Sequence, residues 1–189
     1  MKDLGELKYC LTIEFARSKQ GILMHQRKYS LELISELGLA TSKPINTPID
    51  TSIKLTTREF VEHLCKTNLA EDDVLADQGS YQRLIGKLLY LTVTRPDISF
   101  GVQTLSQYLQ QPKKSRMEAA LRIVRYIKSQ RGQGILLSSN NNDTVTTFCN
   151  ADWAACAHTR KSVTGYLIKV GDSLVSWKSK TNYNIQKFY

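Results

Sequence analysis

The chain has 189 residues, of which 41% are hydrophobic and 23% are charged, so it is long enough to bury one sizeable core or two small ones. Its formal net charge of +9 at pH 7 favours polyanionic partners such as RNA or DNA. No apolar run approaches the ~20 residues that cross a bilayer, which excludes a membrane-spanning helix.

The four cysteines are scattered without a CxxC pair, and no charged-then-apolar leader begins the chain. Both features favour a reducing compartment, and we expect an intracellular protein, cytoplasmic or nuclear, with free thiols. Cys149 and Cys156 lie near His158, but this spacing matches no standard zinc site and a fourth ligand is lacking. The sequence therefore predicts no zinc site.

Residues 7–25 contain two β-like runs joined by a polar turn over residues 16–21, which predicts a β-hairpin. Apolar residues then recur at helical spacing, which predicts a helix over residues 27–38 that is capped by Gly38. From residue 40 to 80 the pattern weakens, with two prolines and a cluster of acids that lacks the spacing of a calcium loop. We expect a linker there, with its acids on a solvated surface.

Three helices are expected between residues 81 and 131. The second begins at Pro96, because proline fits a first helical position and Asp97 suits a first turn, and the third follows Pro112. The side chains expected to be buried, by their helical spacing, are Tyr81, Leu84, Ile85, Leu88, Leu89, Ile98, Val102, Leu105, Leu109, Met117, Ala120, Leu121, Val124 and Ile127.

The side of the third helix opposite these apolar residues is basic. Between residues 113 and 131 the chain has seven basic residues and one acidic residue, Glu118. This excess of positive charge is larger than a helix surface needs in order to be solvated. We therefore expect contacts to nucleic-acid phosphates, although a solvated helix face is the alternative. The predicted phosphate contacts are Lys113, Lys114, Arg122, Arg125, Lys128 and Arg131, together with Arg160 and Lys161 in a later turn.

After Gly134 the pattern changes to short β runs, which predict an antiparallel meander with a last turn at Gly171-Asp172. No helix follows these strands, so one face of the sheet should stay uncovered within the chain. Trp153, Tyr166 and Trp177 offer either base stacking or core packing, and aromatic residues among strands more often fill a core.

Several blocks of the sequence together resemble the pol polyprotein of copia-type LTR retrotransposons. The blocks are MKDLGELKYCLTIEFARSKQGILMHQRKY, KPINTPID, YQRLIGKLLYLTVTRPDISFGV, RIVRYIK, FCNADWAACAHTRKSVTGYLI and SWKSK. They follow the order of the family and cover nearly the whole chain, which makes the resemblance specific.

The resemblance implies the C-terminal part of a reverse transcriptase over residues 1–139 and a truncated first part of a ribonuclease H domain over residues 140–189. The expected fold is α+β, with a primer-grip-like hairpin and a helical thumb or connection region before an incomplete ribonuclease H-like antiparallel sheet. The polymerase Asp-Asp motif of the family would precede Met1, so we expect no polymerase chemistry from these residues.

The hairpin is similar to the family's primer grip, where Leu-Gly-Ile-Glu is usual and this chain has Leu11, Thr12, Ile13 and Glu14. A glycine lets a backbone approach nucleic acid closely, whereas the β-branched Thr12 restricts that approach. The substitution is therefore expected to hinder primer contact.

In the family, the first strand of ribonuclease H ends in Asp-Ala-Asp, and Asn150 stands where the first, metal-binding acid belongs. An amide carries no charge to offset two divalent cations about 3.5–4 Å apart, and Asp152 should lie about 6–7 Å further along the strand. The second family acid is a glutamate shortly after SWKSK, and the chain ends at Tyr189 before it. We expect no intact catalytic or metal site and no cofactor, since the resemblance implies Mg²⁺ only for the intact enzyme.

We thus expect a piece of a retrotransposon pol polyprotein that descends from RNA-directed DNA polymerase and hybrid ribonuclease but is inactive on its own. Its expected partners are RNA, DNA or an RNA–DNA hybrid, and other parts of the polyprotein, with no membrane contact. The alternatives are a non-catalytic nucleic-acid-binding module that uses the basic helix, and a genomic relic that does not fold stably.

Overall fold

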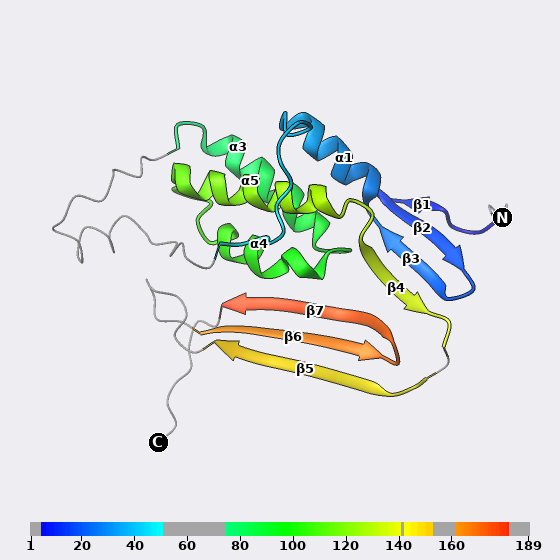
Figure 1. Ribbon diagram of the computed structural model, residues 1–189. Helices are drawn as coiled ribbons and strands as arrows, with labels where there is room; N and C mark the ends of the chain where they lie inside the picture. The colour runs from blue at the N-terminus through cyan, green and yellow to red at the C-terminus, as the bar shows by residue number, and fades with distance from the viewer. Residues whose placement is uncertain (1–4, 51–74, 141, 153–161, 182–189) are drawn as a thin grey trace, which may run out of the picture.

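The computed structural model describes residues 5–50, 75–140, 142–152 and 162–181, and it shows a group of helices with one antiparallel sheet at its end and a second antiparallel sheet along its side (Figure 1). In chain order the elements are β1 (Tyr9–Cys10), β2 (Ile13–Ser18), β3 (Gly21–His25), α1 (Arg27–Glu36), α3 (Gln78–Leu91), the 3-10 helix η1 (Pro96–Ile98), α4 (Ser99–Ser106), α5 (Lys114–Ser129), β4 (Gly134–Ser138), β5 (Val145–Asp152), β6 (Val163–Val170) and β7 (Ser173–Thr181). The α+β class predicted from the sequence is confirmed.

The predicted hairpin is formed by β2 and β3, but its turn is shorter than expected. The two strands pair from Glu14 opposite His25 to Ser18 opposite Gly21, which leaves only residues 19 and 20 for the turn. Residues 16–18 are exposed strand residues, and their small or polar side chains gave them the composition of a turn. The strand β4 then extends this sheet by pairing with β3, so the order is β1-β2-β3-β4.

Helix α1 ends in the glycine cap that the sequence predicts. Gly38 has a φ of +66°, a left-handed conformation that glycine adopts without steric cost. Its N–H donates to the carbonyl of Ser35 at 3.0 Å, and the N–H of Leu39 donates to the carbonyl of Ile34 at 3.0 Å. These two bonds satisfy carbonyls at the helix end and turn the chain toward α5.

Helices α1, α3, α4 and α5 enclose one apolar core. Most of the predicted core residues are buried. Leu89 on α3 is exposed, contrary to the prediction, and Leu91, which was not predicted, is buried. Helix α3 begins at Gln78, three residues before the expected start, because the Asp77 side chain accepts a hydrogen bond from the N–H of Ser80. Of the described helices, none combines the length and the apolar character needed to cross a membrane.

The second sheet has the order β5-β6-β7 and lies beside α4 (Figure 1). Residues 171 and 172 form the turn between β6 and β7, as predicted. The indole N–H of Trp177 donates to the carbonyl of Thr92 at 3.0 Å, which ties β7 to the end of α3. The backbone N–H of Ser138 donates to Ser173 Oγ at 2.8 Å, so β4 links the two sheets.

Candidate nucleic-acid interface

A segment that we call the strap, residues 39–50, crosses the basic side of α5 (Figure 1). Its midpoint is tied to the helix by the backbone N–H of Ile45, which donates to the carbonyl of Arg125 at 3.3 Å. Its far end is packed on α4, where a Cβ added to Gly101 would lie 3.0 Å from two side-chain atoms of Ile49. The strap therefore occupies much of the surface that the sequence assigned to phosphates.

Lys128 holds the first residues of the strap. Its ammonium group donates to three backbone carbonyls, at 3.2 Å for Leu39, 2.7 Å for Ala40 and 2.5 Å for Ser42. A lysine has three donors, so these contacts use the full hydrogen-bonding capacity of its ammonium group. Lys128 serves the junction between α1 and the strap, and we omit it from the candidate interface.

Arg122 holds the last residues of the strap. Its guanidinium donates to Thr47 Oγ1 at 3.0 Å and lies 3.5 Å from the carboxylate of Asp50, with 26% of the side chain exposed. The acid partner already offsets the positive charge of Arg122. A phosphate at this position would have to displace the carboxylate of Asp50.

The start of α5 also differs from the predicted exposed stripe. Lys113 is 7% exposed and Arg116 is 2% exposed, and the Arg116 guanidinium stacks 3.8 Å from the ring centroid of Tyr108. Because Lys113 is buried, it does not belong to the exposed basic surface of α5. Arg160 and Lys161 lie outside the described residues and remain predicted phosphate contacts.

Four further basic residues of the described chain lie around α5 and the strap with exposed or half-buried side chains, and we call them the outer basic surface. Lys114 and Arg125 are eleven residues apart, about three helical turns, so they share one side of α5. Lys43 lies on the strap between the residues that contact Lys128 and Arg125. It was missed in the sequence because it belongs to the expected linker. The members of the surface are Lys43, Lys114, Arg125 and Arg131.

The turn at Leu11 and Thr12, which the sequence analysis compared with a primer grip, is strained. Leu11 and Thr12 connect β1 to β2 with φ angles of +47° and +63°, a two-residue hairpin turn that favours glycine or asparagine. The amide of the buried Gln26 donates to Thr12 Oγ1 at 3.3 Å, and the Tyr90 hydroxyl donates to the carbonyl of Leu11. A glycine at position 12, which the resemblance leads us to expect, would fit the left-handed backbone that Thr12 adopts, and Leu11 is 77% exposed at the tip.

Replacing Thr12 by glycine is expected to raise the free energy of unfolding by about 0.5–1 kcal/mol. Relief of the left-handed strain on a β-branched residue, about 1–2 kcal/mol, outweighs the loss of the long hydrogen bond from Gln26. Urea denaturation of both proteins measures the difference. The change Thr12→Val, which keeps the β-branch and removes the hydroxyl, is the control and should lower the stability; a destabilised glycine variant would contradict the account.

Glu14 has a structural role in addition to its place in the predicted primer grip. Its carboxylate accepts a hydrogen bond at 2.8 Å from the backbone N–H of Lys28 in the first turn of α1, and it lies 3.6 Å from His25 Nδ1. Gln26, which precedes the helix, makes no side-chain cap. Glu14 therefore caps α1 from a neighbouring strand, and its negative charge suits a helix N-terminus.

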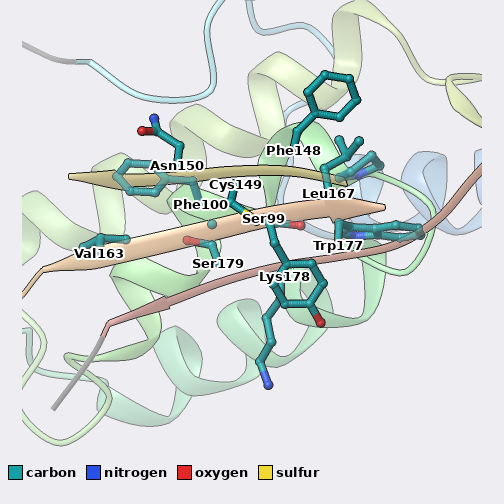
Figure 2. Close-up of a pocket in the computed structure, with 13 residues that line it drawn as sticks. Ser99, Phe100, Phe148, Cys149, Asn150, Val163, Leu167, Trp177, Lys178 and Ser179 are labelled. Atoms are coloured by element: carbon teal, nitrogen blue, oxygen red, sulfur yellow. The ribbon is translucent and has the colours of Figure 1, made fainter. Parts of the chain in front are cut away.

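Asn150 lies on β5 opposite Gly165 and is exposed. It borders an open groove of about 510 Å³ between β5–β7 and the start of α4, which also includes Phe100 and Phe148. Figure 2 shows Asn150 and Phe148 pointing to the same side of β5. The backbone of Asp152 pairs with Val163. Within the described ranges, no three His, Cys, Asp or Glu residues are grouped closely enough to hold a metal ion.

A buried ion pair, which the sequence analysis did not identify, holds η1 against the end of α5. Arg95 is 2% exposed, and its guanidinium contacts the Asp97 carboxylate at 2.6 and 2.9 Å and the carbonyl of Gln130 at 3.0 Å. Burial alone would raise the pKa of Asp97, but the hydrogen bonds and charge of Arg95 outweigh it and lower the pKa below its ordinary value. The Thr-Arg-Pro-Asp run contains both partners, but nothing in it indicates that they are buried.

Comparison with known proteins finds relatives along nearly the whole chain. It is 35% identical over 180 residues to the retrovirus-related Pol polyprotein from transposon RE2 of Arabidopsis thaliana, an alignment that covers 95% of this chain and 12% of that polyprotein. It is 31% identical over 183 residues to the Pol polyprotein from transposon TNT 1-94 of Nicotiana tabacum, with coverages of 95% and 13%.

A third relative is shorter. An uncharacterized mitochondrial protein of Arabidopsis thaliana is 29% identical over 189 residues, which cover 99% of this chain and 72% of that protein. No family model and no solved structure matches the chain. The chain spans about an eighth of the length of the two transposon polyproteins.

Proposed function

Since the chain belongs to the pol polyprotein family of copia-type LTR retrotransposons, we propose that it is a part of such a polyprotein that holds nucleic acid without performing catalysis itself. In this proposal residues 1–139 correspond to the C-terminal part of the reverse transcriptase and residues 140–189 to the start of ribonuclease H. RNA–DNA hybrid is the proposed ligand, held through its phosphates.

The outer basic surface carries the proposal. Arg125 makes no side-chain hydrogen bond or ion pair with another described residue, and Lys43, Lys114 and Arg131 are exposed around it. Contacts of this kind bind phosphates independently of sequence and release counterions, so the affinity should fall steeply with salt. The net charge of +9 adds long-range attraction.

Asn150 supports the absence of catalysis. A two-metal nuclease site needs anionic oxygens to offset the charge of the cations, and the amide of Asn150 offers a neutral oxygen at that position. Its neighbours across the sheet, Gly165 and Ser179, carry no charge that replaces it. The residues paired across the sheet from Asn150 therefore offer divalent cations no anionic ligand.

The test is fluorescence anisotropy of a labelled RNA–DNA hybrid titrated with the purified chain at several salt concentrations. We expect saturable binding, no cleavage of the hybrid with Mg²⁺ or Mn²⁺, and a salt slope that falls by about 1.8 in the double variant Arg125→Gln and Arg131→Gln. Each arginine should account for one phosphate contact.

The matched control replaces two arginines that already have acid partners, Arg17 beside Glu6 and Arg83 beside Asp77, by glutamine. It changes the net charge equally and should leave the slope nearly unchanged. An equal decrease of the salt slope in the two double variants would mean that only the net charge determines binding. Cleavage of the hybrid by nuclease-free protein would refute the absence of catalysis.

A further inference from the structure

The outer face of the second sheet is turned away from the helices. Strand alternation places Cys149, Tyr166 and Lys178 side by side on this face, since Cys149 is opposite Tyr166 and Tyr166 is opposite Lys178. Figure 2 shows Lys178 pointing to the side of the sheet opposite that of Asn150 and Phe148. No described helix or strand covers this face.

We propose that this outer face binds single-stranded nucleic acid, with Tyr166 stacking on a base and Lys178 and Lys180 contacting the adjacent phosphates. The ligand and the surface both differ from those of the hybrid contact around α5. The proposal therefore goes beyond the proposed function and can fail independently of it.

Tyr166 is placed and exposed as a stacking residue requires. Its exposed fraction is 39%, and its neighbours across the sheet are the small Cys149 and the flexible Lys178. By contrast, Trp177 on the other face donates its indole N–H to the backbone next to α3. The sequence favoured core packing for both aromatic residues. Of the two, only Trp177 makes a side-chain hydrogen bond to the helical part of the described chain.

The charge of the outer face complements an anionic strand. Lys178 and Lys180 are exposed, and neither side chain makes a hydrogen bond or ion pair with another described residue. No acid is found among the outer-face residues of the three strands, which are Val145, Thr147, Cys149, Ala151, Thr164, Tyr166, Ile168, Val170, Ser176, Lys178 and Lys180. Asp152 ends β5 at the same end of the sheet as Lys180, at the position that alternates with Ala151, whereas Asp143 and Asp172 lie at the other end.

The spacing of these groups favours a single strand over a duplex. Lys178 and Lys180 are two residues apart on one strand, about 6–7 Å, which allows them to contact successive phosphates of an extended chain. Lys178 lies directly opposite Tyr166, so a base on the tyrosine ring and its phosphate can be engaged together. Bases paired in a duplex do not present their faces to a flat sheet.

The experiment measures anisotropy of a labelled twelve-nucleotide oligothymidine and a matching oligouridine with the purified chain. Tyr166→Leu is expected to weaken binding about tenfold, whereas Tyr166→Phe keeps the ring and should retain the affinity. The pair Lys178→Gln and Lys180→Gln should lower the salt slope by about 1.4. Circular dichroism checks that these surface variants remain folded.

The control pair Lys8→Gln and Lys19→Gln changes the charge equally on the first sheet, where both lysines are exposed. The proposal would be overturned if this control pair lowered the salt slope as much as the Lys178 and Lys180 pair does. Equal affinity of the Tyr166→Leu and Tyr166→Phe variants would also overturn it. If sedimentation shows a dimer that Tyr166→Leu dissociates, the face binds a second copy instead and the proposal fails. Hybrid binding with no oligothymidine or oligouridine binding would refute this inference alone, while loss of both would refute the proposed function as well.

Discussion

Replacing Asp97 by asparagine is expected to lower the free energy of unfolding by about 3 kcal/mol, the largest effect we predict for a single substitution. The buried guanidinium of Arg95 would lose its charged partner while remaining in a low-dielectric environment, and such unpaired buried charges cost about 3–5 kcal/mol. The 21% exposure of the Asp97 side chain places the estimate at the lower end of that range. Urea denaturation measures the change.

The matched control is Asp77→Asn, the same chemical change at an exposed pair with Arg83. Asparagine also serves as a helix N-cap, so this variant should change the stability by no more than about 0.5 kcal/mol. Similar losses in the two variants would show that burial of the pair is not what makes Asp97 important.

The stability contributed by Asp97 should depend on pH in a defined direction. Its pKa is lowered on folding, so the contribution is present above the ordinary aspartate pKa of about 3.9 and is lost as the pH falls through the lower folded value. The wild-type protein should lose this part of its stability in acid, and the Asp97→Asn variant should lack that part of the titration. Identical acid profiles would contradict the assignment.

Replacing Lys128 by methionine is expected to lower the free energy of unfolding by about 2 kcal/mol. The methionine keeps the apolar stem but leaves three strap carbonyls without their donor, and hydrogen bonds to charged groups contribute about 1.5–3 kcal/mol. The partial exposure of the site lets water replace some of these bonds. Thermal or urea denaturation gives the measurement.

Arg125→Met is the matched control for this prediction, because Arg125 is on the same side of α5 but has no side-chain partner among the described residues. Its stability should change by no more than about 0.5 kcal/mol, while its affinity for the hybrid should fall. A strong loss of stability in Arg125→Met, with none in Lys128→Met, would contradict the account that Lys128 stabilises the strap and Arg125 does not.

The local elements were predictable because their causes lie within a few neighbouring residues. The cap at Gly38 depends on a single left-handed residue after an amphipathic helix, and the turn at residues 171 and 172 depends on two residues between alternating strands. The start of α3 was misplaced because the capping role of Asp77 was not separated from the nearby acids. The pairing of β4 with β3 joins residues more than a hundred positions apart, and no local pattern indicates it.

The sequence by itself determined the family and most of the order of helices and strands, and it raised the expectation that Asn150 replaces an acid. Only the tertiary structure decided which basic residues are exposed to a ligand, because the charge pattern of a helix does not reveal which other segment packs over it. Lys128 and Leu39 are 89 residues apart, yet Lys128, a predicted phosphate contact, donates a hydrogen bond to the carbonyl of Leu39. In the same way, strand pairing assigned Tyr166 and Trp177 to opposite faces of one sheet. The physical reason is that periodicity and charge are local properties, whereas burial and hydrogen-bond partners depend on contacts between distant segments.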